Sequence, residues 1–145
     1  MNQILPVKMA QEWAASGSKW LLMAGILSIA AAHITFGIGL AAWVSSLPFL
    51  LFLAGTQGWK SRLLFAVALI GAWSLAIVKI ITPPIPLGLV FLFSVPIALV
   101  HLPGYLLWVR FRTHPGGFLL FPVVLTLTEW LQYTCTPFAS WGVAA

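Results

Sequence analysis

Hydrophobic residues in this 145-residue chain fall in long, nearly uninterrupted runs, separated by short stretches that contain polar residues, glycine and proline. A transmembrane helix needs about 20 mainly apolar residues, whereas transmembrane β-strands alternate in polarity, which these runs do not. The pattern therefore predicts an all-α membrane protein, a bundle of about five transmembrane helices. The predicted spans cover residues 20–36, 40–54, 63–81, 87–109 and 118–134.

The connections fit this division of the chain. Residues 35–39 contain glycine and residues 82–86 contain three prolines, and both stretches are typical of tight turns between helices. Residues 1–18 are mostly polar and are interpreted as a cytoplasmic segment ahead of a transmembrane domain over residues 19–145. Pro48 lies inside the short second run, and Pro96 lies inside the fourth.

The composition indicates that the bilayer is the solvent. The chain is 61% hydrophobic and 6% charged, whereas soluble domains carry about 25% charged residues. The net charge of +5 does not indicate nucleic-acid binding, because the basic residues are spread singly between apolar runs rather than clustered on one face. We expect membrane phospholipids as partners and no nucleic acid.

The basic residues predict the orientation of the bundle. If the five spans alternate in direction, six of the seven basic residues fall on one side of the membrane and only Lys79 falls on the other. The positive-inside rule then places the N-terminus in the cytoplasm and the C-terminus outside it. The six residues are Lys8, Lys19, Lys60, Arg62, Arg110 and Arg112.

Small residues recur at intervals of four, which places them on one face of a helix and lets two helices approach closely. This spacing supports a packed bundle and says nothing about a catalytic or binding function. The residues are Ala24, Ser28 and Ala32 in the first span, Ala68 and Ala72 in the third, and Ser94 and Ala98 in the fourth.

Glu129 is the only acidic residue within the predicted spans, and the only other acid in the chain is Glu12. A carboxylate at the centre of a transmembrane helix costs about 2.5–3.5 kcal/mol on insertion scales, so such residues usually face a partner or a polar cavity. We therefore expect Glu129 to have a functional role or a specific structural partner, and the candidates for that partner are Lys79 and His33.

Other polar residues in the spans have simpler interpretations. Lys79 lies near the end of its span and can extend to the interface, and His33 is interpreted as an interfacial histidine. His101, four residues before Tyr105, is explained by helix packing. A polar pocket open to the outer leaflet remains the alternative for Lys79, His33 and Glu129, and would receive a lipid head group.

The sequence contains no pattern typical of a catalytic, metal or cofactor site. Paired carboxylates, a Ser/His/Asp order and a dinucleotide fingerprint are all missing, and we expect no catalytic residue, no metal and no cofactor. Cys135 is the single cysteine. It lies at the end of the fifth span without a base nearby in sequence, so an inert thiol is expected.

Residues 128–132 read Thr-Glu-Trp-Leu-Gln, and residues 136–142 read Thr-Pro-Phe-Ala-Ser-Trp-Gly. Together with Leu-Ala-Ala-Trp at residues 40–43 and Leu-Pro-Phe-Leu-Leu at residues 47–51, they resemble the membrane region of apolipoprotein N-acyltransferases. The resemblance covers about 125 residues from Lys19 onward. Gln132 stands where that family usually has arginine, and the turn before Trp141 is altered.

The resemblance implies a multi-pass protein of a bacterial-type inner membrane that takes part in lipoprotein maturation. The family transfers an acyl chain from a phospholipid to a lipoprotein, by means of a nitrilase-like domain with a Glu-Lys-Cys triad. No residue of this chain matches the triad, so the chain is expected to be a fragment or a diverged member, inactive alone. Glu129, Trp141, Lys79 and His33 are then candidates for lining the lipid or substrate cavity, with a lipoprotein as partner of the full-length enzyme.

A second hypothesis belongs to another class of protein. A small transporter or channel subunit would use Glu129 as a proton or ion relay with Lys79 or His33, and helices interrupted at Pro48 and Pro96 would suit it. The absence of paired repeats and the few polar residues in the inner half of the bundle argue against this reading. A membrane scaffold without a ligand is the third option.

Overall fold

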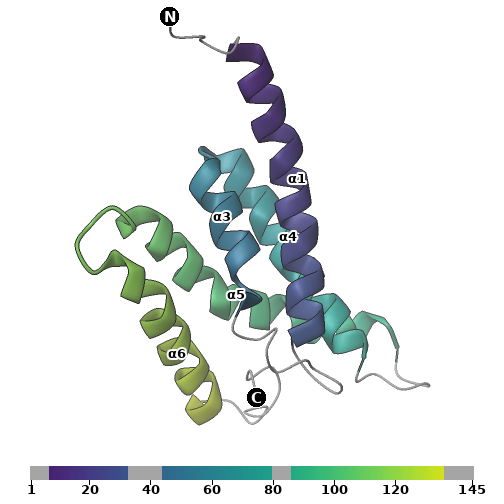
Figure 1. Ribbon diagram of the computed structural model, residues 1–145. Helices are drawn as coiled ribbons and strands as arrows, with labels where there is room; N and C mark the ends of the chain where they lie inside the picture. Colours follow the sequence, from purple (N-terminus) through teal and green to yellow (C-terminus); the bar gives the residue numbers. More distant parts are fainter. Residues whose placement is uncertain (1–6, 33–43, 80–85, 136–145) are drawn as a thin grey trace, which may run out of the picture.

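The computed structural model describes residues 7–32, 44–79 and 86–135, with side chains from Ser18 onward, and these residues form helices without a strand (Figure 1). The all-α prediction is therefore confirmed for the described part of the chain. The helices are α1 (Val7–Ala32), α3 (Leu47–Gly55), α4 (Trp59–Val78), α5 (Gly88–Phe111) and α6 (Gly117–Cys135).

Three of these helices, α4, α5 and α6, are long and apolar enough to cross a membrane. Their bounds lie within a few residues of the third, fourth and fifth predicted spans. Both α5 and α6 continue through their internal prolines, so Pro96 does not interrupt the fourth span as the transporter hypothesis supposed. The hydropathy pattern thus located these helices and their ends.

The first two predicted spans differ more from the observed helices. Helix α1 begins at Val7, within the segment predicted as a polar N-terminal region, and its apolar part covers Ser18–Ala32. Helix α3 begins only at Leu47 because Pro48 favours the first turn of a helix. Its 9 residues are about 14 Å long at a rise of 1.5 Å per residue, less than half of a hydrocarbon core.

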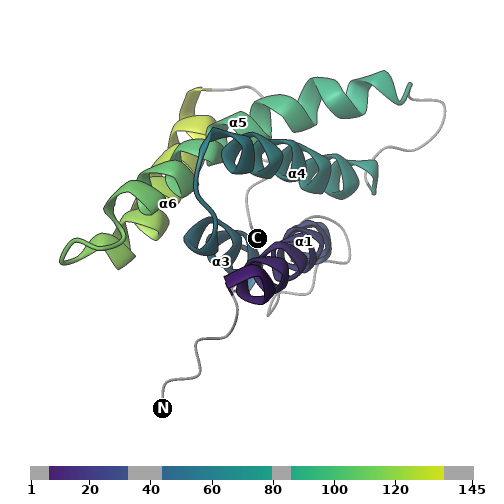
Figure 2. The same ribbon diagram turned by 90° about the horizontal axis from the view of Figure 1, so that it is seen from above.

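The helices pack in two layers (Figure 2). Helices α1 and α3 lie side by side in one layer, and α4 and α5 form the other, with α1 in contact with α4. Helix α6 packs along α5 at the edge of the bundle, and apart from Gly117 none of its residues is fully buried. Helix α4 is therefore central, and α6 is peripheral among the described helices.

An aromatic cluster joins α3, α4, α5 and α6. The ring of Tyr105 lies with its centroid 5.0 Å from that of Phe65, 6.2 Å from that of Phe49 and 4.8 Å from that of Phe121. Phe49 and Phe65 meet edge to face at 5.3 Å. Such pairs stabilise by about 0.5–1.5 kcal/mol beyond the area they bury, so this cluster contributes to the packing of four helices at once.

The small residues predicted to allow close packing in α4 and α5 are buried in the bundle. Ala68, Ala72, Ser94 and Ala98 are all buried, and Ser94 Oγ accepts a hydrogen bond of 2.9 Å from Ser74 Oγ. In α1 the prediction is wrong for Ala24, which is exposed. The neighbouring Gly25 is the buried position instead, because it lies against the ring of Phe49 in α3.

Two connections lie toward the same end of the bundle in Figure 1, where α1 also begins. Between α3 and α4, Gly58 takes a φ of 94°, and between α5 and α6, Gly116 takes a φ of 79°, a region that favours glycine. These two connections bring Arg62 and Arg112 to a shared cavity. Lys79 lies at the opposite end of α4, so the described basic side chains near the helix ends are distributed as the sequence predicts.

We expect Gly25→Ala to destabilise the contact of α1 with α3. A Cβ at this position would lie 2.5 Å from two ring atoms of Phe49, which is buried and has no free space to move into. Overpacking of this kind costs about 1–3 kcal/mol. Thermal unfolding in detergent micelles, followed by circular dichroism, measures the loss.

The matched control is Gly71→Ala in α4, where an added Cβ would meet no atom within 4 Å. Because alanine favours a helix over glycine, this variant should keep or raise the stability by up to about 1 kcal/mol. Equal melting temperatures for the two variants would contradict the close contact of Gly25 with Phe49.

Candidate functional site

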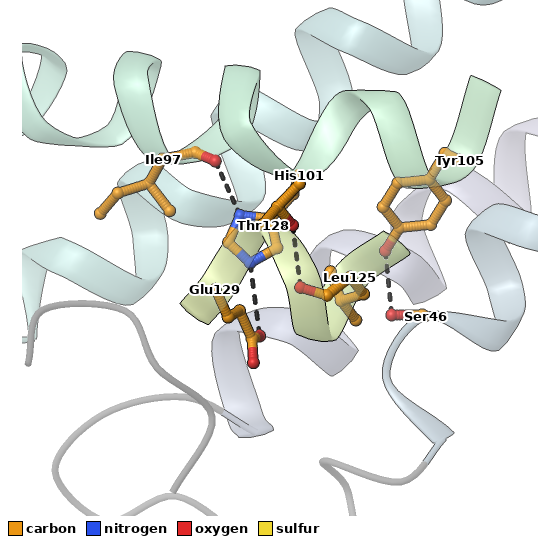
Figure 3. Close-up of polar contacts among 7 residues, drawn as sticks. All are labelled: Ser46, Ile97, His101, Tyr105, Leu125, Thr128 and Glu129. Atoms are coloured by element: carbon orange, nitrogen blue, oxygen red, sulfur yellow. Dashed lines mark hydrogen bonds and ion pairs between the residues drawn. The ribbon is translucent and has the colours of Figure 1, made fainter. Parts of the chain in front are cut away.

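Glu129 in α6 lies against His101 in α5 (Figure 3). Glu129 Oε1 is 3.6 Å from His101 Nε2, and the two side chains are 22% and 5% exposed. This separation is an ion-pair distance and is too long for a hydrogen bond. The carboxylate of Glu129 therefore has a specific partner on the neighbouring helix, which is the structural role that its position in a span indicated.

The other ring nitrogen of His101 fixes the protonation of the pair. His101 Nδ1 lies 2.7 Å from the carbonyl oxygen of Ile97, one turn earlier in α5. A carbonyl only accepts, so Nδ1 carries the proton of this hydrogen bond. A favourable contact of Nε2 with Glu129 then needs one further proton, either on Nε2 or on the carboxyl group.

Trp73 of α4 completes the surroundings of His101. Its ring centroid lies 4.8 Å from that of the imidazole at an interplanar angle of 40°, and Trp73 is 1% exposed. The histidine is thus held between an indole ring on one helix and a carboxylate on another. Three helices, α4, α5 and α6, meet at this point.

Tyr105 continues the same face of α5 one turn later. Its hydroxyl donates a hydrogen bond of 2.9 Å to Ser46 Oγ, just before α3 (Figure 3). Within α6, Thr128 Oγ1 donates to the carbonyl of Leu125 at 2.8 Å and so does not join the pair of Glu129. Among the described residues, no hydrogen bond links the pairs Ser74–Ser94, His101–Glu129 and Tyr105–Ser46 to one another.

Lys79 is not the partner of Glu129. It caps the C-terminal end of α4, and its Nζ donates a hydrogen bond to the backbone carbonyl of Ala30 in α1. The side chain of Lys79 is exposed, in agreement with its interpretation as a residue at the membrane interface. The other two candidates, His33 and Trp141, lie outside the described residues.

His101 is the residue that sequence reasoning misjudged, because it was explained by packing alone. The signal that identifies it is its distance from the α5–α6 connection. His101 lies 11 residues before Arg112 and Glu129 lies 13 residues after Gly116. At 1.5 Å per residue the two positions are about 17 and 20 Å from the same turn, so two antiparallel helices bring them to one level.

An apolar groove runs between α1, α4 and α5, in the half of the bundle away from Arg62 and Arg112. Its volume is about 710 Å³, and its only polar side chain is that of Ser74. Val78 and Leu87 mark its end near Lys79. The remaining lining residues are Met23, Ile26, Leu27, Val67, Ile70, Gly71, Leu75, Val90 and Phe91. A groove of this shape and composition can hold an extended hydrocarbon chain.

Within the described residues, no three His, Cys, Asp or Glu side chains gather as metal ligands. Cys135 is exposed at the end of α6, and the polar atom recorded beside its Sγ is Thr134 Oγ1 at 3.6 Å. A hydroxyl of this kind is a poor base for a thiol. The described residues therefore offer an acid–histidine pair and an apolar groove.

Comparisons of the chain with protein families, with curated proteins and with solved structures found no match in any of the three.

We expect the contact of Glu129 with His101 to appear as a coupling energy. Glu129→Ala and His101→Ala should each destabilise the bundle, and the double variant should lose less than the sum. Side-chain pairs within membranes couple by about 0.6 kcal/mol on average and up to about 1.7 kcal/mol. Unfolding by sodium dodecyl sulfate in mixed micelles measures the four free energies.

A second cycle with Glu129→Ala and Lys79→Ala serves as the control. These two side chains have separate partners on different helices, so their effects should add to within about 0.5 kcal/mol. Equal coupling in the two cycles would contradict a specific Glu129–His101 pair.

Proposed function

We propose that the chain is a multi-pass protein of a bacterial-type inner membrane, with its N-terminus in the cytoplasm and its C-terminus outside. Three helices long and apolar enough to cross a membrane support this proposal. Residues 18–32 of α1 are a shorter apolar helix that would add a further crossing, whereas α3 covers less than half of a hydrocarbon core. The convergence of Arg62 and Arg112 at one end of the bundle agrees with a cytoplasmic location for that end.

Within that membrane, the proposed role is that of the membrane portion of an apolipoprotein N-acyltransferase-like protein. The chain binds the phospholipid acyl donor and does not itself form or break bonds. The observation that carries this proposal is the apolar groove of about 710 Å³ between α1, α4 and α5. It lies in the half of the bundle that the orientation above assigns to the outer leaflet, where such an enzyme takes its donor lipid.

Glu129 supports this role by holding α6 in place. Helix α6 packs along α5 over an extensive interface, although apart from Gly117 none of its residues is fully buried. The pair of Glu129 with His101 is one contact in this interface and that of Phe121 with Tyr105 is another. The segment around Glu129 would thereby lead the chain toward the outer surface in a fixed direction.

The second candidate function is a proton or ion relay, and the pair of Glu129 with His101 favours it. Glu129 and His101 lie 3.6 Å apart in two of the helices long enough to cross a membrane, and intramembrane acid–histidine pairs occur in proton pathways. A relay needs a chain of exchangeable groups on both sides of the pair. The described polar pairs are separate from one another, which supports the structural role over the relay.

We expect a phospholipid with a photoactivatable diazirine in its acyl chain to label the groove when the chain is reconstituted in liposomes. Peptide mapping should find the label on Leu27, Val67 and Phe91 more often than on Val123, an exposed residue of α6 outside the groove. Gly71→Leu should lower the groove labelling about fivefold or more, because a side chain at this position projects into the groove without meeting another atom.

Gly55→Leu at the end of α3 is the matched control, since its side chain also meets no neighbour within 4 Å but lies outside the groove. This variant should label as the unchanged chain does. Equal labelling of Val123 and the groove, or no effect of Gly71→Leu, would remove the main support for the proposed lipid-binding role.

In the same liposomes we expect neither acyl transfer to a diacylated peptide nor proton flux that depends on Glu129. The described residues provide no activated nucleophile, and Glu129 has no polar connection beyond His101. Mass spectrometry of the peptide and a pH-sensitive dye inside the liposomes measure the two activities. Transfer that is lost in Cys135→Ala would overturn the support role, and flux that is lost in Glu129→Gln would favour the relay.

A further inference from the structure

A second cavity, of about 290 Å³, lies at the opposite end of the bundle from the lipid groove. It is formed where the α3–α4 connection meets the last turn of α5. Residues 53–62 form one side of it, and Val109 and Arg112 form the other. The lining residues are Leu53, Thr56, Gln57, Gly58, Ser61, Arg62, Val109 and Arg112.

The lining of this cavity is divided between apolar and polar residues. Leu53 and Val109 belong to the helices that enter the bundle, and the polar residues belong to the connection and the helix ends. Thr56 Oγ1 and Ser61 Oγ donate to backbone carbonyls at 2.8 and 3.3 Å, so their protons are already in use. The hydrogen-bond donors left for a ligand come chiefly from the two arginines.

The charge of Arg62 and Arg112 is not neutralised within the described part of the protein. Among the residues whose side chains the structure describes, from Ser18 onward, Glu129 is the only acid, and it lies beside His101 in another region of the bundle. The guanidinium group of Arg112 lies 5.9 Å from the ring centroid of Trp108, a contact that orients it without removing its charge. Two unpaired guanidinium groups at one cavity attract an anion, and their planar form matches phosphate oxygens.

The positive-inside rule accounts for the presence of basic residues at this end but not for their arrangement. Four of them lie near these two connections, and only Arg62 and Arg112 line the cavity. Lys60 and Arg110 each lie two residues before them, are exposed as Arg62 is, and do not line the cavity. A topological signal would work equally well with all four side chains dispersed, so the convergence of two arginines calls for a ligand.

We propose that this cavity binds the phosphate group of an anionic phospholipid in the leaflet at the basic end of the bundle. Arg62 and Arg112 hold the phosphate, and the acyl chains leave the cavity past the half-buried Val109 into the bilayer. The apolar side of the lining favours a lipid over free phosphate, which has no hydrocarbon to place there. This site is separate from the groove of the proposed function and does not depend on it.

Native mass spectrometry of the full chain in detergent, at about 0.15 M salt, tests the proposal with three probes. These are dioleoyl phosphatidylglycerol, dioleoyl phosphatidylcholine and inorganic phosphate. The unchanged chain should retain phosphatidylglycerol in preference to phosphatidylcholine. The double variant Arg62→Gln/Arg112→Gln should lower the retention of phosphatidylglycerol roughly 10- to 30-fold, as expected for the loss of two basic contacts to an anionic lipid.

Lys60→Gln/Arg110→Gln is the matched control, because it removes the same charge from the same end without touching the cavity. At this ionic strength its effect should stay below about threefold, since neither side chain lines the cavity and exposed charges are weakened by salt. Circular dichroism checks that both double variants keep the helical content of the unchanged chain.

Three results would overturn the proposal. They are equal losses in the two double variants, equal retention of phosphatidylglycerol and phosphatidylcholine by the unchanged chain, and displacement of phosphatidylglycerol by inorganic phosphate at low millimolar concentration. The last result would assign the arginines to a free phosphate rather than to a lipid. Preferential retention that is lost only in the arginine variant and resists phosphate would support the lipid site.

Discussion

The placement of one carboxylate inside an apolar bundle is the constraint that bears most directly on how α5 and α6 align. A lone ionised Glu129 would be costly at this depth, and the structure meets that cost by placing His101 opposite it at 3.6 Å. The backbone carbonyl of Ile97 and the ring of Trp73 then fix the imidazole. Phe121 of α6 also packs against the buried core, so this polar contact and hydrophobic packing together hold α6 against α5.

Hydropathy alone located three helices within a few residues, because the length of a membrane span is set by the thickness of the bilayer and needs no knowledge of neighbours. It was less successful for α1 and α3, where the ends depend on local signals. A helix can continue through polar residues outside the apolar core, as α1 does from Val7. Pro48 similarly marks a helix start in α3, although the apolar run begins earlier.

The partner of Glu129 could not be read from hydropathy, because pairing depends on how two helices align across a turn. Lys79 was a reasonable candidate by charge, yet it lies in α4 and reaches the carbonyl of Ala30 instead. The pairing with His101 can be predicted because the two residues lie at similar distances from the α5–α6 connection. This prediction requires that α5 and α6 are first assumed to form an antiparallel hairpin. The convergence of Arg62 and Arg112 was likewise hidden, since the sequence gives the side of the membrane for each arginine but not their approach to one cavity.

The two cavities suit different parts of a lipid molecule, and this difference bears on the lipid-binding role of each. The groove along α1, α4 and α5 has almost no polar group and can select only for a hydrocarbon chain. The cavity at Arg62 and Arg112 would select for a phosphate head group as well as for hydrocarbon. A groove without head-group selection suits a donor site that must release its lipid, whereas a site with two guanidinium groups suits a lipid that stays bound. The basic end would then anchor the bundle in one leaflet while the groove exchanges lipid with the other.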